Sequence, residues 1–178
     1  RWLGHDAVAV LDGGWQAWTR EGRPQSQALH APQPASFLLG QPRNELVLDA
    51  AAIAAWAGDP GRRVLDAREG PRYRGEAEPI DPVAGHIPGA LSAPYPANLG
   101  PDGLWLSPAD LAARYRAILG STAATDTALY CGSGVTAAHD LLALAHAGLG
   151  EARLYAGSWS EWITDPRRPI ATGGGAAA

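Results

Sequence analysis

Short apolar segments alternate with helical segments along most of this chain, and this alternation restricts its fold more than any other feature. The predicted strands cover residues 63–66, 90–93, 127–130 and 153–155. The predicted longer helices cover residues 50–57, 108–119 and 135–147. Asp49 and Ser107 directly precede two of these helices, and both residue types are preferred N-caps. Short strands separated by helices are typical of parallel sheets, so the sequence predicts an α/β fold with a parallel sheet and helices on both faces.

A repeated segment indicates how the chain is organised. Residues 12–18 match residues 156–162 at an offset of 144 positions, and each copy places two Trp residues three positions apart behind a glycine turn. Each copy follows a short β-like run, residues 7–11 in the first and 153–155 in the second. Tryptophans at this spacing share one helix face, so we expect both pairs to be buried. Because the second copy ends a domain-sized stretch, the first is expected to end an earlier repeat.

This repeat divides the chain into four parts. Residues 1–23 are expected to be the end of an N-terminal repeat whose front is missing. Residues 24–38 contain three prolines and no apolar period, which predicts an extended linker. Residues 39–172 are expected to form one complete domain, and residues 173–178, which are only Gly and Ala, a flexible tail.

Charge and composition exclude several classes of partner. The formal net charge is -4, and the 14 basic residues, all Arg, form no cationic cluster that would attract a nucleic acid backbone. No apolar run approaches the ~20 residues that a membrane helix needs. We therefore expect a soluble, cytoplasmic protein with no nucleic acid and no membrane among its partners. The single cysteine, Cys131, excludes an internal disulfide and a cysteine-rich metal site.

Cys131 follows the predicted strand 127–130 and begins a glycine-rich loop, residues 131–134, ahead of a helix. In a parallel α/β sheet, ligands bind at this edge, where the strands end. Glycines let such a loop curl so that backbone N–H groups converge, and the helix N-terminus adds a positive dipole, a combination that suits an anion. The same groups would stabilise the thiolate of Cys131, and the hydroxyls of Ser133 and Thr136 can donate to the same anion. The loop favours a nucleophilic cysteine over an inert buried one.

Two other cysteine chemistries fit this loop less well. Cysteine phosphatases place an Arg six positions after the cysteine to hold the phosphate, and that position is Ala137 here. Papain-like acyl transfer needs a His within reach of the thiol. His139 and His146 lie on the following helix, where a packing role is favoured. The remaining chemistry is one in which the bound anion is sulfur itself.

Four stretches of the sequence resemble the rhodanese superfamily, in its tandem-domain sulfurtransferase form. They are Leu65 to Arg68 with Arg72 to Glu76, Gly85 to Ala90, the Cys131 loop, and Gly157 to Trp162. Their order and spacing make the resemblance specific. It covers residues 39–172 as a catalytic rhodanese domain and residues 1–23 as the end of an N-terminal rhodanese repeat. The fold that it implies is a rhodanese-like parallel sheet with helices on both faces.

The resemblance implies that the protein is a sulfurtransferase. In the family, the loop cysteine takes a sulfane sulfur from a donor, becomes a persulfide, and passes the sulfur to cyanide or a thiol. Cys131 is the matching residue, and the N–H groups of its loop suit a persulfide anion. No cofactor and no metal are implied. The implied partners are a small-molecule sulfur donor, a thiol or cyanide acceptor and, within the chain, the missing N-terminal repeat.

The residues around the loop indicate the donor. Members that use 3-mercaptopyruvate resemble Cys-Gly-Ser-Gly-Val-Thr, which this chain matches, whereas thiosulfate-type members resemble Cys-Arg-Lys-Gly-Val-Thr. The substrate-binding residues that the resemblance implies are Arg72, Gly132, Ser133, Gly134, Val135 and Thr136. A guanidinium at Arg72 can hold a carboxylate by two parallel hydrogen bonds. Mercaptopyruvate-type members carry a second Arg after a Glu-Pro pair; Ile80 takes that place here, and Arg74 is a candidate replacement.

Two alternatives stay open. The protein is a thiosulfate:cyanide sulfurtransferase if thiosulfate rather than 3-mercaptopyruvate is the donor. It is a non-catalytic rhodanese-like binding or sulfur-delivery module if the loop performs no turnover. Under each of these readings, Asp66 and Arg68 are expected to form structural pairs, and His86 is expected to anchor a turn.

Overall fold

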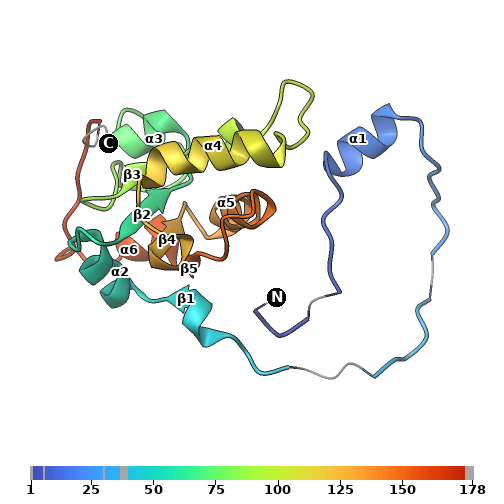
Figure 1. The fold of residues 1–178 in the computed structure, drawn as a ribbon, viewed down its shortest axis with the longest axis horizontal. Helices are drawn as coiled ribbons and strands as arrows, with labels where there is room; N and C mark the ends of the chain where they lie inside the picture. Colours follow the sequence, from blue (N-terminus) through green and yellow to red (C-terminus); the bar gives the residue numbers. More distant parts are fainter. Residues whose placement is uncertain (1, 6, 30, 37–39, 175–178) are drawn as a thin grey trace.

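The centre of the structure, a computed structural model, is a five-stranded parallel sheet (Figure 1). The described residues are 2–5, 7–29, 31–36 and 40–174. The strands are β1 (Val47–Leu48), β2 (Arg63–Asp66), β3 (Leu91–Ser92), β4 (Thr127–Tyr130) and β5 (Arg153–Tyr155), in the order β1-β5-β4-β2-β3. The central strand β4 pairs with β2 along the whole of both strands. The predicted parallel sheet is therefore confirmed.

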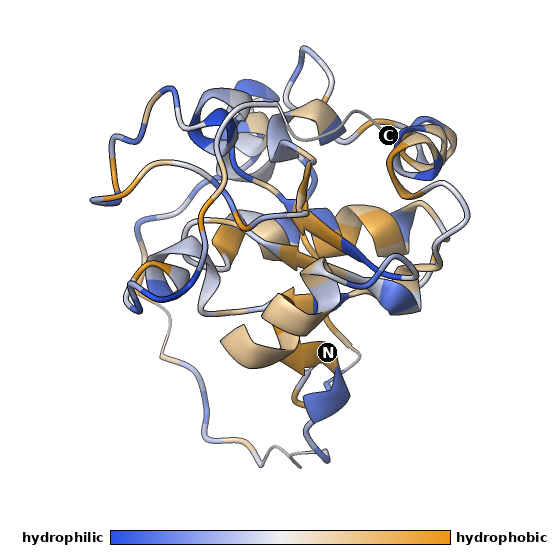
Figure 2. Ribbon diagram, turned by 90° about the vertical axis from the view of Figure 1, so that its left-hand side faces the viewer, coloured by the Kyte–Doolittle hydropathy of each residue, from blue (hydrophilic) through white to orange (hydrophobic). Residues whose placement is uncertain are grey.

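Helices cover both faces of this sheet, as the sequence predicted. The α-helices are α1 (Gly14–Arg20), α2 (Ala50–Ala57), α3 (Gly70–Arg74), α4 (Pro108–Leu119), α5 (Val135–His146) and α6 (Ser158–Trp162), and the 3-10 helices are η1 (Asn44–Leu46), η2 (Tyr95–Asn98) and η3 (Ala124–Asp126). Leu65 and Leu129 belong to the core cluster that α4 and α5 cover. Val64 and Ala128 belong to the cluster that α2 and α6 cover. Successive strand residues thus point to opposite faces, and Figure 2 shows the hydrophobic strands between their helices.

Local capping explains why the two best-predicted helices begin where they do. The carboxylate of Asp49 accepts the N–H of Ala52 at 2.8 Å, and the hydroxyl of Ser107 accepts the N–H of Asp110 at 3.2 Å. Strands β2, β4 and β5 also have their predicted bounds, while β3 and α5 are slightly shorter than predicted. The elements β1 and α3 were not predicted, because a two-residue strand carries no period and α3 begins with Gly70-Pro71.

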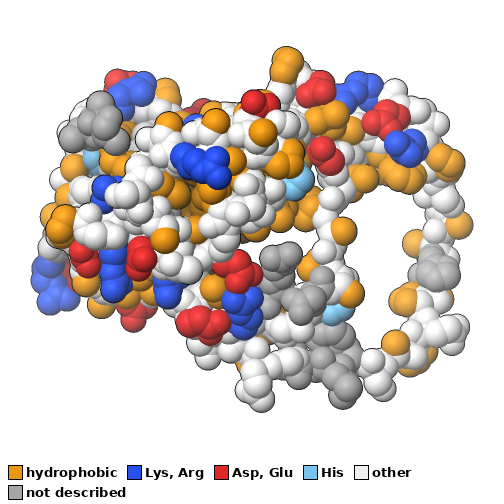
Figure 3. Space-filling view, viewed as in Figure 1, with side chains coloured by type: hydrophobic (Ala, Val, Ile, Leu, Met, Phe, Trp, Pro, Cys, Tyr) orange, Lys and Arg blue, Asp and Glu red, His pale blue; other side chains and the backbone are white. Residues whose placement is uncertain are grey.

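The strand predicted over residues 7–11 is absent from the structure. Val8, Val10 and Leu11 are 57%, 65% and 55% exposed. A strand needs a hydrogen-bonding neighbour, and no strand in the described part of the chain pairs with this run. Figure 3 shows hydrophobic side chains exposed along this N-terminal segment.

The first copy of the tryptophan repeat also differs from its prediction. Trp159 and Trp162 in α6 are buried, as predicted, but Trp15 in α1 is 62% exposed. The start of α1 contacts the segment ahead of α4, where a Cβ at Gly13 would lie 2.6 Å from Leu104, and Ala17 is buried, but Trp15 lies on the side of α1 that stays exposed. The two copies share a sequence but not an environment.

The described residues between α1 and η1 form no helix or strand. Residues 24–29 and 31–36 are exposed and contain neither helix nor strand. Residues 30 and 37–38 of the predicted linker, residue 39 at the predicted start of the domain, and residues 175–178 of the predicted tail lie outside the described residues. Among the described residues, no helix is long and apolar enough to cross a membrane.

A buried polar network joins η2 to α4 and α5. The amide nitrogen of Asn98 donates to Asp140 Oδ1 at 2.7 Å, and its oxygen accepts from Arg114 Nε and the Tyr115 hydroxyl, both at 3.1 Å. His139 Nδ1 lies 3.6 Å from Asp140 Oδ1. Asp140 Oδ2 is buried and has no hydrogen-bond partner among the residues that the structure describes. Burial raises the pKa of Asp140, and the hydrogen bonds from His139 and Asn98 offset only part of this effect.

The substitution Asp140→Asn is expected to become more stabilising as the pH rises. In the folded state the pKa of the Asp140 carboxyl lies above its ordinary value of 3.8. Ionisation therefore favours the unfolded state, and the wild type loses stability as the pH rises from 3.8 through the folded-state pKa. Asn cannot ionise, and its carbonyl can still accept from Asn98. The difference in the free energy of unfolding between Asp140→Asn and the wild type, measured by urea denaturation, should therefore be smallest below about pH 3 and increase toward about pH 7. A difference that does not vary with pH would contradict this account.

Candidate active site

Cys131 lies directly after β4, at the carboxyl edge of the sheet. It is 2% exposed, and its Sγ accepts the backbone N–H of Gly134 at 3.1 Å. The helix α5 begins at Val135, so the positive end of its dipole faces the loop. Gly134 has a φ of 84°, and a Cβ there would lie 3.0 Å from the carbonyl oxygen of Ala156. Only glycine fits this position without strain, so this glycine allows the loop to bring its N–H group to the sulfur.

Ser158, at the start of α6, holds the backbone of Cys131. Its Oγ accepts the N–H of Cys131 at 3.1 Å and donates to the carbonyl oxygen of Tyr155 at 3.0 Å. Ser158 has a φ of 56°, and the matching position of the first repeat copy, Gly14, has a φ of 58°. The left-handed conformation therefore belongs to the repeat. A serine here is strained, but its hydroxyl adds one hydrogen bond to Cys131 and one to Tyr155.

The backbone of α6 also supports the loop. The carbonyl oxygen of Cys131 accepts the N–H of Trp159 at 2.9 Å, and that of Gly132 accepts the N–H of Ser160 at 3.0 Å. The other predicted loop residues lie toward the outside: Ser133 and Val135 are exposed and Thr136 is half-buried. The structure thus gathers the predicted residues of the loop at one end of α5.

Arg72 lies beside this loop, but its guanidinium is already bound. A Cβ at Gly132 would lie 3.6 Å from both terminal nitrogens of Arg72. Arg72 donates to Glu78 Oε1 through Nε at 2.9 Å and lies 2.6 Å from the same oxygen through Nη2. Nη2 also donates to Asp81 Oδ2 at 3.0 Å, and the Arg72 side chain is only 15% exposed. Arg72 is therefore a largely buried, ion-paired arginine and not a solvated surface residue.

Glu78 is shared between two guanidinium groups. Arg68 donates to Glu78 Oε2 at 3.1 Å and to Asp66 Oδ2 at 2.7 Å, so Asp66 and Arg68 form the structural pair that the sequence predicted. Burial acts to raise the pKa of Glu78. The hydrogen bonds from Arg72 and from the backbone N–H groups of Asp81 and Ile80 outweigh it, and the pKa of Glu78 is lowered. This carboxylate is therefore ionised and holds both arginines.

Arg74, the candidate replacement for the arginine absent at Ile80, binds elsewhere. It donates to both carboxylate oxygens of Glu76, at 2.7 Å and 2.8 Å, in a pair that is largely exposed. A Cβ at Gly70 would lie 2.8 Å from Arg74 Nη1. The guanidinium thus folds back over the start of α3.

His86 and His139 have packing roles. His86 Nδ1 lies 2.7 Å from the carbonyl oxygen of Tyr73, and its ring stacks on that of Tyr73 at 3.9 Å, so it anchors a turn as predicted. The ring of His139 stacks on Trp105 at 4.3 Å. Neither geometry provides a general base for Cys131.

Four residues at the site were not singled out from the sequence. They are Glu78, Asp81, Ser158 and Ser160. The two acids gave a signal, since Glu78-Pro79-Ile80-Asp81 follows Arg72 closely enough for ion pairing. The two serines lie in the second copy of the tryptophan repeat, residues 156–162, and that pattern predicts only the burial of its tryptophans. The two serines belong to the site because they form hydrogen bonds with the Cys131 loop, and only the folded structure shows these bonds.

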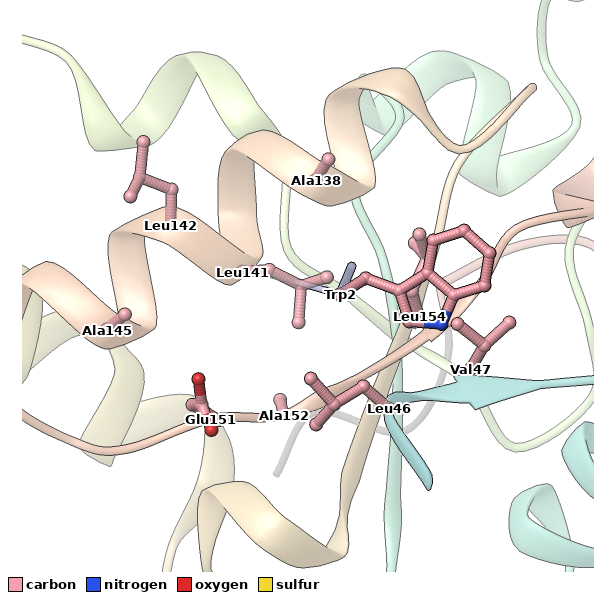
Figure 4. A pocket seen from close by; sticks show the side chains of 10 residues that line it. All are labelled: Trp2, Leu46, Val47, Ala138, Leu141, Leu142, Ala145, Glu151, Ala152 and Leu154. Atoms are coloured by element: carbon pink, nitrogen blue, oxygen red, sulfur yellow. The ribbon is translucent and has the colours of Figure 1, made fainter. Parts of the chain in front are cut away.

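No metal site accompanies these residues. Within the part of the chain that the structure describes, no three His, Cys, Asp or Glu side chains are grouped to hold a metal ion. An apolar pocket of about 300 Å³ lies elsewhere, between α5, β1 and β5, with Trp2, Val47 and Leu141 in its lining (Figure 4). Its one carboxylate, Glu151, is bound by Arg43 at 2.6 Å. This pocket is separate from the cysteine loop.

Comparison with known proteins agrees with the geometry. Residues 49–165 match the rhodanese-like domain family. A probable 3-mercaptopyruvate sulfurtransferase of Pseudomonas aeruginosa is 54% identical over 97% of this chain and 61% of its own length. A putative thiosulfate sulfurtransferase, SseB, of Mycobacterium tuberculosis is 39% identical over 93% of this chain and 58% of its own length.

The solved structures give the same fold. The crystal structure of YnjE superposes with a TM-score of 0.84 at 25% identity, covering 97% of this chain and 44% of that one. The chain spans about three fifths of the length of the two curated relatives, 61% and 58%. The family match, residues 49–165, contains strands β2 to β5, the helices from α2 to α6 and the loop of Cys131. The chain therefore belongs to the rhodanese-like domain family.

Proposed function

We propose that this protein is a sulfurtransferase that moves a sulfane sulfur from a donor to cyanide or a thiol through a persulfide on Cys131. The observation that carries the proposal is the position of the Cys131 sulfur, at the N-terminus of α5 and 3.1 Å from the N–H of Gly134. Membership of the family and the sulfurtransferase names of the relatives support it.

The reaction needs only a thiolate and a place for an anion. With 3-mercaptopyruvate as donor, the Cys131 thiolate attacks the donor's thiol sulfur, the carbon–sulfur bond breaks, and the carbon takes the thiol proton. The products are pyruvate and the persulfide anion on Cys131. Cyanide then attacks the outer sulfur, so that thiocyanate leaves and the thiolate is restored. Atoms and charges balance without any cofactor or metal.

The loop and the helix N-terminus suit the anionic forms of this cycle. Both the thiolate and the persulfide carry one negative charge, which backbone N–H groups and the dipole of α5 stabilise. In this proposal Gly132, Ser133, Gly134, Val135 and Thr136 surround the outer sulfur. The hydroxyl of Thr136 on the first turn of α5 is a further donor.

We propose 3-mercaptopyruvate as the favoured donor, with thiosulfate as the alternative. The loop has Gly132-Ser133 where thiosulfate-type members have Arg-Lys, so a dianion entering it would lose water without gaining a fixed cation. The 54% identity to a probable 3-mercaptopyruvate sulfurtransferase supports this choice. The 39% identity to a putative thiosulfate sulfurtransferase supports the alternative.

We also propose that residues 1–23 end an N-terminal rhodanese repeat, joined by the linker 24–38 to the catalytic domain 39–172 and its tail 173–178. The rest of that repeat is the proposed intrachain partner. The contact of Asp12 Oδ1 with the N–H of Trp105, at 3.0 Å, supports packing of this segment on the catalytic domain. We propose the cytoplasm as the location, because a nucleophilic thiol stays reduced there.

Cys131→Ser is expected to abolish sulfur transfer and leave the fold unchanged. A serine hydroxyl is a poor acceptor of sulfane sulfur, and the replacement is nearly isosteric. Turnover should fall by ~10²-fold or more, as is typical of a deleted nucleophile. Thiocyanate formation measures turnover, and mass spectrometry after incubation with each donor should show one added sulfur on the wild type only. If Cys131→Ser turns over at close to the wild-type rate, Cys131 is not part of the mechanism. If the wild type itself shows no turnover, the non-catalytic binding or delivery module is favoured.

Placing Arg at position 132 and Lys at position 133 is expected to shift donor preference toward thiosulfate. Gly132 tolerates a side chain, because a Cβ there meets its nearest atoms, on Arg72, at an ordinary 3.6 Å. A charge-assisted hydrogen bond contributes ~1.5–3 kcal/mol, so the ratio of kcat/KM values should change on the order of 10-fold or more. The change should weaken with salt. Steady-state assays with both donors measure it, and an unchanged ratio would show that these two residues do not select the donor.

A further inference from the structure

We propose that Asp81 is a specificity-determining residue of the candidate active site, because it occupies part of Arg72 and disfavours dianionic donors more than monoanionic ones. This inference rests on the proposed function. Asp81 Oδ2 accepts from Arg72 Nη2 at 3.0 Å, and its side chain is 8% exposed. The residue therefore sits where a donor carboxylate would meet the arginine.

Most hydrogen-bonding nitrogens of Arg72 are already engaged, so few are left for a donor carboxylate. Nε and Nη2 are both engaged by Glu78, and Nη2 also by Asp81. Among the described residues, none forms a hydrogen bond with Nη1, which lies 3.6 Å from the Cβ position of Gly132. A donor carboxylate can thus reach one nitrogen directly. A second hydrogen bond to Arg72 requires Asp81 to give way.

The charges around Arg72 oppose an anion. The connected ion pairs contain two guanidinium groups and three carboxylates, from Arg68, Arg72, Asp66, Glu78 and Asp81. With all five ionised the cluster carries one net negative charge. Arg72 therefore contributes hydrogen bonds but no excess positive charge. Of the three carboxylates, Asp81 is the one that lies against the loop beside Arg72, since its Oδ2 is 3.9 Å from the Cβ position of Gly132.

Asp81 is also fixed to the loop. The hydroxyl of Ser160 lies 2.8 Å from Asp81 Oδ1 and 2.7 Å from the carbonyl oxygen of Gly132. That carbonyl oxygen already accepts the N–H of Ser160, so the hydroxyl hydrogen can go to Asp81. The carboxylate is thus held in place beside the path to Cys131 by Arg72 on one side and Ser160 on the other.

The discrimination follows from the number of charges on the donor. At neutral pH 3-mercaptopyruvate carries one negative charge and thiosulfate carries two. Coulomb energy scales with the product of the charges, so one carboxylate repels the dianion twice as strongly. Removing that carboxylate should help both donors, and the fold-change for thiosulfate should be about the square of the fold-change for 3-mercaptopyruvate.

The first test measures Asp81→Asn with both donors. We expect kcat/KM to rise roughly 3-fold for 3-mercaptopyruvate and about 10-fold for thiosulfate, mainly through KM, with a smaller rise at high salt. Asp81→Glu keeps the charge and should retain the wild-type donor ratio, which a merely structural role would not predict. The control is Asp59→Asn: this surface carboxylate pairs with Arg62 ahead of β2, at the opposite edge of the sheet, and should change neither donor.

The second test needs no turnover, so it separates this inference from the proposed function. Cys131 is alkylated with anionic iodoacetate and with neutral iodoacetamide, and the ratio of the two rates reports the charge near the sulfur. Asp81→Asn should raise this ratio roughly 3-fold, and Asp81→Glu and Asp59→Asn should leave it unchanged. An unchanged ratio in Asp81→Asn, or equal fold-changes for the two donors, would overturn the role of Asp81. A wild type that turns over neither donor would overturn the proposed function, and the alkylation ratio would still decide the role of Asp81.

Discussion

The contact between the loop after β4 and the start of α6 determines the geometry of the candidate site. Ser158 binds the N–H of Cys131, and Trp159 donates its N–H to the carbonyl oxygen of the same residue. With both backbone groups of Cys131 held by α6, the loop can turn its later N–H groups toward the sulfur. The burial of Trp159 and Trp162 fixes α6 against the sheet, so the core of the domain and the position of the nucleophile depend on one another.

Much of the fold could be predicted from the sequence because it follows local rules. The N-caps at Asp49 and Ser107 and the apolar strands β2, β4 and β5 carry signals within a few residues. The run at residues 7–11 has the same local signal, but it forms no strand because no neighbouring strand in the described chain pairs with it. Trp15 has the same local pattern as the buried Trp159, but the described part of the chain leaves its side chain 62% exposed. Local pattern predicts what a segment can become, and its surroundings decide whether it does.

The candidate site could be predicted only in part. The cysteine loop is contiguous in sequence, so its glycines, hydroxyls and helix were visible together. The surroundings of Arg72 were not visible in the sequence. They depend on how the segment 76–85 folds back and which of its carboxylates then contact Arg72. The sequence shows that acidic residues lie a few positions after Arg72. It does not show that Glu78 and Asp81 bind the guanidinium nitrogens of Arg72 that a substrate would use. Which charges neutralise one another at a site depends on the folded structure.

The edges of the sheet limit how this molecule associates with others. Its outer strands, β1 and β3, are two residues long, while the longest strands, β2 and β4, lie inside the sheet. An exposed edge of this length offers few free backbone groups for another chain to extend by strand addition. Aggregation through added strands is therefore disfavoured. An assembly that includes this domain would then rely on surfaces other than the sheet edge, and substitutions on those surfaces could change its specificity without disturbing the sheet.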